Sequence, residues 1–188
     1  MKTNLRLILF TVLLIALTTI CKILFGADLN WSGFSPIIAI ALFSGMIIKE
    51  KNMSFLLPLL SLLISDIVIE ILHSQGLFDY AGFYSDQWKN YLILLACTLI
   101  GWGLRGRSYT SIVAGAFIAP IAFFLISNLN VWMGPYSTYS KDFNGLMDCY
   151  IAGLPFYKNA LIATLLFLPA IILSYNYIAK QKLDLRLV

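Results

Sequence analysis

Residues 109–131, YTSIVAGAFIAPIAFFLISNLNV, form an apolar run without one charged side chain. A transmembrane helix needs about 20 mostly apolar residues, so this run is long enough to cross the hydrocarbon core of a bilayer. Its proline is tolerated there, because neighbouring helices can satisfy the freed backbone carbonyl. Similar runs recur along the chain. The sequence therefore predicts an all-α membrane protein whose six transmembrane helices occupy residues 4–25, 35–49, 53–73, 88–104, 109–131 and 157–179.

The composition of the whole chain supports this interpretation. Hydrophobic residues make up 60% of the 188 residues and charged residues only 12%, whereas about a quarter of a soluble domain is charged. Such a composition excludes a water-soluble enzyme, a disordered chain and a nucleic-acid-binding protein. No linker or internal repeat divides the sequence, so residues 1–188 are predicted to form one integral membrane domain.

The sequence holds no motif that would carry catalytic chemistry. It has 3 cysteines without a Cys-x-x-Cys pair, and 1 histidine, so a zinc site, a multi-histidine metal site and a catalytic triad are not expected. Phosphate-binding loops and an HExxH sequence are also missing. We therefore expect no enzyme activity, no metal site and no cofactor.

Basic residues are distributed unevenly between the two sides of the predicted bundle. No small-x-small cleavage site follows the first apolar run, so we expect a retained helix rather than a cleaved signal peptide. With the N-terminus inside, nine Lys and Arg residues fall on the inner side and four on the outer side. Because basic loops face the cytoplasm, both termini are predicted to be cytoplasmic. The inner set is Lys2, Arg6, Lys49, Lys51, Arg105, Arg107, Lys180, Lys182 and Arg186, and the outer set is Lys22, Lys89, Lys141 and Lys158.

The predicted outer segments are longer than the inner turns and are rich in aromatic residues. Trp and Tyr gather at the headgroup level of membranes, so any one of these residues could belong to an interfacial belt. Their concentration on one side favours a pocket, since aromatic side chains stack on flat ring ligands. Segments 26–36 and 132–156 are predicted to form a lid over an outward pocket that contains Trp31 and Trp132.

Three titratable residues lie on one face of the third predicted span. Asp66, Glu70 and His73 stand at i, i+4 and i+7 of a helix, which places them above one another. Ionisable residues within a span are costly and usually face a cavity or a partner. Asp66 is therefore predicted to be hydrogen-bonded or to face a wet pocket, and His73 to partner Glu70. The sequence leaves open whether this stripe serves ligand recognition, proton movement or a structural hydrogen-bond cluster.

Asparagines mark the outer ends of the last two spans. Asn128 and Asn130 close the fifth span, and two amides two residues apart cannot point the same way on a regular helix. The helix is therefore predicted to unwind there. Asn159 opens the sixth predicted span. These amides either bind a polar edge of a ligand or cap helices.

Two stretches carry a resemblance to known membrane proteins. The first is NWSGFSP at 30–36, leading into AIALFSG at 39–45. The second combines Ser65 and Asp66, NLNVW at 128–132 and GLMDCYIAGLPF at 145–156. Over about residues 5–178 the chain resembles an uncharacterised family of small bacterial membrane proteins. That family is similar to the substrate-binding S-components of energy-coupling-factor (ECF) vitamin transporters.

The resemblance implies a six-helix S-component-like bundle, a vitamin site under the outer loops, and an energising transporter module as partner. S-components that dock on this module usually carry a small-x-x-x-small pair on the first helix. Here Ala16 has Val12 and Ile20 at that spacing, so the pair is missing. The protein therefore either docks differently or resembles the solitary, cobalamin-specific S-components. In a cobalamin interpretation Cys149 is a candidate cobalt ligand, and the alternatives are a small buried residue or a disulfide to Cys21.

The function that these observations predict is uptake of a small nutrient, a vitamin-like ring compound captured in an outward-facing pocket. The alternatives are a proton-coupled permease that uses Asp66 and Glu70, and a structural subunit of a membrane complex. The expected partners are a small-molecule ligand and the lipid bilayer, with no nucleic acid. The candidate ligand-binding residues are Asn30, Trp31, Ser35, Asp66, Glu70, Asn128, Asn130, Trp132, Tyr136, Tyr150 and Asn159.

Overall fold

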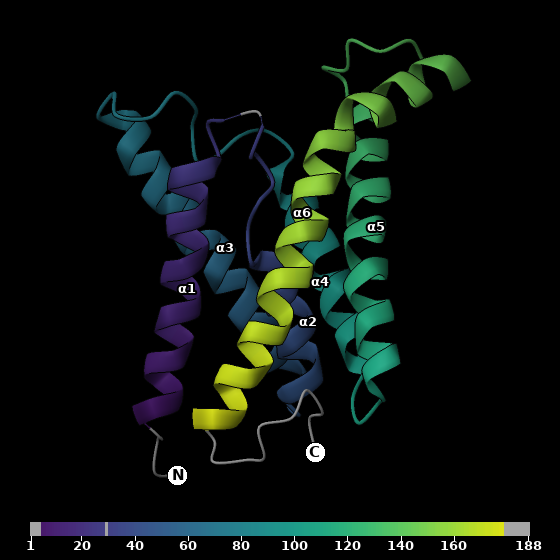
Figure 1. Ribbon diagram of the computed structural model, residues 1–188. Coiled ribbons are helices and arrows are strands. Elements are labelled where there is room, and N and C mark those ends of the chain that lie inside the picture. The colour runs from purple at the N-terminus through teal and green to yellow at the C-terminus, as the bar shows by residue number, and fades with distance from the viewer. Residues whose placement is uncertain (1–4, 29, 179–188) are drawn as a thin grey trace.

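A computed structural model describes residues 5–28 and 30–178, and within these ranges the chain is all-helical, as predicted. Residues 1–4, 29 and 179–188 lie outside the described part, and with them the predicted inner-side residues Lys2, Lys180, Lys182 and Arg186. Figure 1 shows the helices running up and down the molecule. The six helices are α1 (Leu5–Phe25), α2 (Ile37–Ile47), α3 (Lys51–Ser74), α4 (Gln87–Gly103), α5 (Tyr109–Met133) and α6 (Phe143–Ile178).

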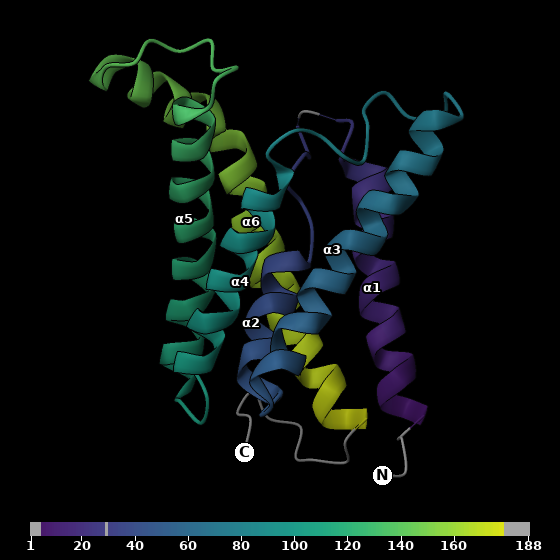
Figure 2. The same ribbon diagram turned by 180° about the vertical axis from the view of Figure 1, so that it is seen from behind.

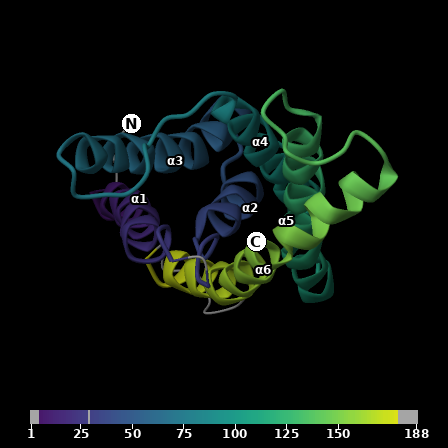
Figure 3. The same cartoon turned by 90° about the horizontal axis from the view of Figure 1, so that it is seen from above.

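Helix α2 lies inside the bundle. Nine of its eleven residues are buried, from Ile38 to Met46. Seen from above in Figure 3, the other five helices surround it, and it packs mainly against α4, α3 and α6. A helix that is apolar on all sides is expected to be buried in this way.

Four of the described helices are long and apolar enough to cross a membrane, namely α1, α3, α5 and α6. Large apolar side chains stand exposed on α1, including Leu9, Val12, Leu13 and Leu24, which suits contact with lipid. Helix α2 is shorter than the predicted span 35–49, because residues 30–36 form turns and irregular backbone that end at Pro36. The described part of the chain is therefore all-helical, and its several long apolar helices indicate a membrane protein.

The connection between α5 and α6 differs from the prediction. Helix α5 is regular to Met133, so it does not unwind at Asn128, and α6 begins at Phe143 rather than near residue 157. Figure 1 shows the first turns of α6 bending away from the bundle at the end opposite residues 104–108. The loop between the two helices is thus confined to residues 134–142.

Local sequence explains the early start of α6. The Asp142 carboxylate accepts the backbone N–H of Gly145 at 2.8 Å and the Ser140 hydroxyl at 2.8 Å, which is N-terminal capping. The N–H of Gly145, with the Ser140 hydroxyl, lowers the pKa of the Asp142 carboxyl. Gly145, Cys149 and Gly153 follow at a spacing of four and are buried. The first turns of α6 therefore present a face of small residues that packs against the rest of the protein.

The opposite end of the bundle has short connections. Arg105 donates to the backbone carbonyls of Gly45, at 2.7 Å, and of Ile48, and so satisfies carbonyls at the end of α2 that have no partner within the helix. The same guanidinium lies over the Trp102 ring. Figure 2 shows α2, α3 and α4 converging at this end.

Candidate ligand-binding site

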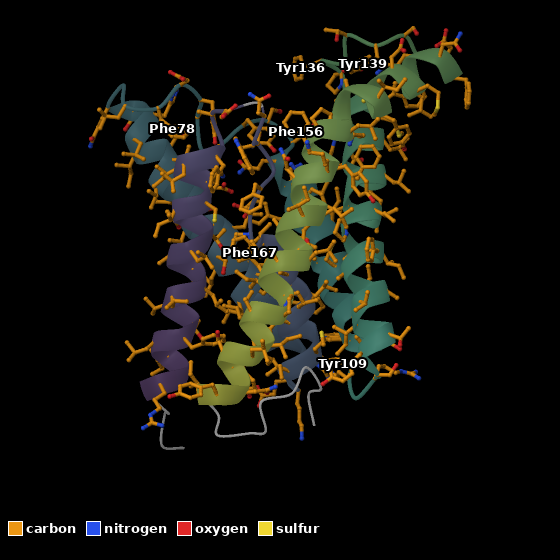
Figure 4. The ribbon with its side chains drawn as sticks, viewed as in Figure 1. Phe78, Tyr109, Tyr136, Tyr139, Phe156 and Phe167 are labelled. Atoms are coloured by element: carbon orange, nitrogen blue, oxygen red, sulfur yellow. The ribbon has the colours of Figure 1, made fainter. Side chains whose placement is uncertain are left out.

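A cavity of about 270 Å³, called the apolar cavity below, lies among α1, the start of α2, α3, α5 and α6. Its wall is mostly apolar, with a few Ser, Thr and Asn side chains. Figure 4 shows Phe156 beside the top of α6, facing the centre of the bundle. Such a wall suits a flat ring ligand. The aromatic residues that line it are Phe34, Tyr80, Phe123, Phe124, Phe156 and Tyr157.

A second cavity of about 400 Å³, called the polar cavity below, adjoins the first. Lys22, Leu62 and Phe123 line both cavities, so the two share a wall. The lining that belongs to the polar cavity alone includes Asp66 and Gln87. Together the cavities form an apolar chamber with a polar side.

A hydrogen-bond network is centred on Asp66. Its carboxylate is fully buried and pairs with the Lys22 ammonium. It also accepts the Gln87 amide at 2.5 Å and the Tyr91 hydroxyl at 2.5 Å. Gln87 donates in addition to the backbone carbonyl of Gly82, at 3.0 Å. Asp66 therefore joins α1, α3 and α4 at the wall of the polar cavity, and the prediction that its carboxylate is hydrogen-bonded is confirmed.

The other two titratable residues on this face of α3, Glu70 and His73, contact the segment between α3 and α4, residues 75–86. Glu70 accepts the backbone N–H groups of Gly82, at 2.9 Å, and of Phe83, at 3.2 Å. His73 Nδ1 lies 2.9 Å from the carbonyl oxygen of Phe78, so its predicted pairing with Glu70 is wrong. The reason is that the 75–86 segment lies over this face of α3 and engages both side chains.

Segment 75–86 packs closely on the helices below it. A Cβ on Gly82 would lie 2.0 Å from the backbone oxygen of Asp66, so only glycine allows this approach. The Tyr80 hydroxyl lies against Gly26 at the end of α1, where a Cβ would meet it at 1.9 Å. Burial, with a smaller effect of the Asp66 charge, raises the pKa of Tyr80. The Tyr80 hydroxyl thus remains a neutral group at the cavity wall.

A second segment, residues 30–36, closes the chamber from the side of α6. The buried Asn159 amide donates to the backbone carbonyls of Asn30, at 2.8 Å, and of Ser32, at 2.9 Å. Gly33 has a φ of +88°, and a Cβ there would lie 2.9 Å from the backbone oxygen of Phe156. Asn159 is therefore a clamp for this segment.

The structure brings three of the candidate residues to the cavity walls. Ser35 and Asn128 line the apolar cavity, and Asp66 lines the polar cavity. Asn128 lies within the regular part of α5, and its amide donates to the Phe124 carbonyl four residues earlier, at 2.9 Å.

The two tryptophans of the predicted lid lie elsewhere. Trp31 is 49% exposed and packs against Phe25 and Phe34, while the Trp132 indole donates to the Ser140 carbonyl at 2.8 Å. Neither lines the apolar or the polar cavity. The segments over the chamber are 30–36 and 75–86, because α6 occupies most of the predicted 132–156 loop.

Other candidates lie outside the two cavities. Asn130 and Tyr136 line a third pocket of about 230 Å³, whose wall shares Tyr84 and Asn90 with the polar cavity, and Figure 4 shows Tyr136 at the extreme end of the molecule. The Tyr150 hydroxyl donates to the Leu125 carbonyl at 3.1 Å. The Cys149 thiol is free and buried and donates to the Asn128 carbonyl at 3.4 Å. Cys21 is also free and lines the apolar cavity, so the alternative of a disulfide between them is not formed.

The groups that meet Asp66 were not among the residues predicted from the sequence. Lys22 was predicted only as a basic residue of the outer side, and neither Gln87 nor Tyr91 was a candidate. The Lys22–Asp66 pairing could have been predicted, because Lys22 ends one apolar span, Asp66 lies in the outer half of another, and charged residues within spans usually pair with one another.

Comparison with protein families places the whole chain in one group. A family of unknown function, DUF6580, matches residues 1–185. The chain belongs to this family. Comparisons with curated proteins and with solved structures found no match. In this DUF6580 protein the cavities and their walls are the features that bear on function.

Proposed function

We propose that this protein captures a small, vitamin-like ring compound from outside the bacterial cytoplasmic membrane for uptake into the cell. One observation carries the proposal: the aromatic apolar cavity adjoins a polar cavity that bears the Lys22–Asp66 pair, in which the carboxylate is fully buried. Ligand sites are typically apolar and carry a few polar groups that orient the ligand. The chamber has this composition, and two clamped segments cover it.

In this proposal the protein is a six-span, S-component-like bundle with both termini in the cytoplasm. The first turn of α1 and the last turn of α6 lie at the same end of the bundle (Figure 1). This arrangement supports the six-span topology, since an even number of crossings returns the chain to its starting side. Val12, Ala16 and Ile20 lie on the exposed side of α1, where a module would dock without the usual pair of small residues. Either an unusual contact with an energising module or solitary action is compatible with this surface.

Native mass spectrometry of the purified protein tests the capture function. We expect a retained small molecule, and we expect Asp66→Asn to retain it at least about tenfold more weakly, since an amide cannot accept Lys22, Gln87 and Tyr91 as a carboxylate does. Glu70→Gln is the matched control. It keeps an oxygen for the Gly82 and Phe83 N–H groups and should retain the molecule as the wild type does.

Melting temperatures measured on the same samples separate binding from folding. If the Asp66→Asn variant retained the small molecule as well as the wild type does, Asp66 would have no role in ligand binding. Loss of thermal stability with unchanged retention would assign this carboxylate to packing alone.

A proton-coupled permease is the second candidate, and the Lys22–Asp66 pair at the polar cavity favours it, because both groups can exchange a proton. Uptake of the retained compound by cells with a dissipated proton gradient distinguishes the two candidates. Uptake that persists supports capture without proton coupling, and uptake that stops supports the permease. Co-purification of a stoichiometric protein partner would instead support a structural subunit.

A further inference from the structure

Lys22 occupies the junction of the two cavities. Its side chain lines both and is 22% exposed. Among the described residues its ammonium donates to Asp66, and an ammonium has three N–H donors. Two donors therefore remain for a group inside the chamber.

Asp66 cannot take the same part. Its carboxylate is fully buried and already accepts three donors, from Lys22, Gln87 and Tyr91. A ligand donor would have to displace one of them. Asp66 is thus a positioning residue that aims Lys22 at the chamber, and the chamber offers donors to its ligand.

The charges around the chamber limit the charge of that ligand. Lys22 and Asp66 are the charged residues among those that line the two cavities, and their charges cancel. Glu70 lines neither cavity and accepts backbone N–H groups, and Lys89 pairs with Asp86 at the surface. A charged ligand would bring an uncompensated charge into a mostly apolar site, which is costly. A neutral ligand keeps the net charge of the site at zero.

We propose that the ligand is a neutral, flat ring compound with hydrogen-bond acceptors along one edge, such as ring carbonyls or ring nitrogens. This inference rests on the proposed capture function and names its substrate class. The acceptor edge receives the free N–H groups of Lys22, and the rings lie in the apolar cavity beside Phe123 and Phe156, which also line the polar cavity. Tyr80 stands at the same wall, and its hydroxyl is a further donor for the acceptor edge.

Three probes of the same shape test this class: 2-acetylnaphthalene, which is neutral and carries an acceptor, 2-naphthoate, and the cation of 2-(aminomethyl)naphthalene. Affinity is measured from the ligand-dependent rise in melting temperature of the full chain in detergent. We expect the neutral ketone to bind more tightly than either ion. In Lys22→Met its affinity should fall at least about tenfold, the loss expected for a hydrogen bond to a charged group. Lys158→Met removes an exposed lysine of α6 and should bind the ketone as the wild type does.

The ranking of the probes on the wild type is decisive even if Lys22→Met does not fold. A carboxylate or an amine that binds as tightly as the ketone would overturn the inferred class while the capture function stands. Equal affinity of the ketone for wild type and folded Lys22→Met would overturn the role of Lys22. If no probe binds the wild type, the inferred ligand class is overturned, whereas the capture function stands as long as native mass spectrometry finds a retained small molecule.

Discussion

Asn159 is the residue that ties segment 30–36 to the middle of α6. Its buried amide donates to two backbone carbonyls, those of Asn30 and Ser32. The substitution of this amide would leave two partly buried carbonyls without these donors, as well as removing the hydrogen bonds themselves. Asn159 therefore acts on the site by holding its cover, although it does not line either cavity.

Two substitutions at Asn159 should differ in severity. Asn159→Ala removes both donors and should lower the free energy of unfolding by about 1–3 kcal/mol. Asn159→Asp keeps the shape but turns acceptor oxygens toward two carbonyl oxygens, so it should be the more destabilising change. Asn144→Ala alters an exposed asparagine of the same helix and should have little effect. Unfolding of the three variants in detergent checks the order, and equal stability of all three would contradict the clamp.

The behaviour of single residues could be predicted only in part. Helical spacing placed Asp66, Glu70 and His73 on one face, and the structure has them there. Their partners could not be predicted, because Lys22 and Tyr91 reach Asp66 from other helices. Such contacts depend on how α1 and α4 are rotated and shifted against α3, which the pattern of a single span does not contain.

At the scale of elements, glycines set the distance between α2 and α4. A Cβ on Gly45 would lie 2.2 Å from the Thr98 backbone oxygen, and one on Gly101 would lie 2.3 Å from the Leu42 backbone oxygen. These neighbours are backbone atoms, so they cannot move without separating the helices. Small residues of this kind allow close helix contacts in membranes, and here they keep α2 in the centre of the bundle.

Gly101→Ala should therefore lower the free energy of unfolding by about 1–3 kcal/mol through overpacking. Gly103→Ala is the matched control on the same helix, since nothing lies within 4 Å of the position of its Cβ. It should be neutral or stabilise by about 0.5–1 kcal/mol, because alanine loses less backbone entropy than glycine in a helix. Unfolding of both variants in one detergent checks the contrast, which would disappear if α2 and α4 were loosely packed.

Helices were predicted well where the sequence is uniformly apolar and less well where it is mixed. Apolar runs correspond to α1, α3 and α5 within a few residues. The first turns of α6 were predicted as a loop, because residues 143–156 mix aromatic, polar and small residues that are typical of loops. Their helix depends on N-capping by Asp142, which is a local contact, and on the burial of the small face against the rest of the protein, which is a tertiary feature.

At the scale of the whole molecule, the two ends of the bundle differ in construction. One end has short connections near residues 48–50 and 104–108, and Arg105 joins α4 and α2 there. The other end has the longer segments and both cavities. The position of the cavities at this end could be predicted from loop length and aromatic content, whereas their lining could not, since a membrane belt and a pocket have the same composition.

The orientation of this asymmetric bundle is a prediction that can be tested directly. Nine basic residues against four place the end with short connections in the cytoplasm, so the cavities should open to the outside. A reporter enzyme that is active only outside the cytoplasmic membrane should be inactive when fused after Val188. The same reporter fused after Ser140, in the 134–142 loop, should be active because five crossings precede it in the predicted six-span topology. High activity at Val188 would show an odd number of crossings or an inverted bundle, and an inverted bundle would turn the chamber toward the cytoplasm and exclude capture from outside.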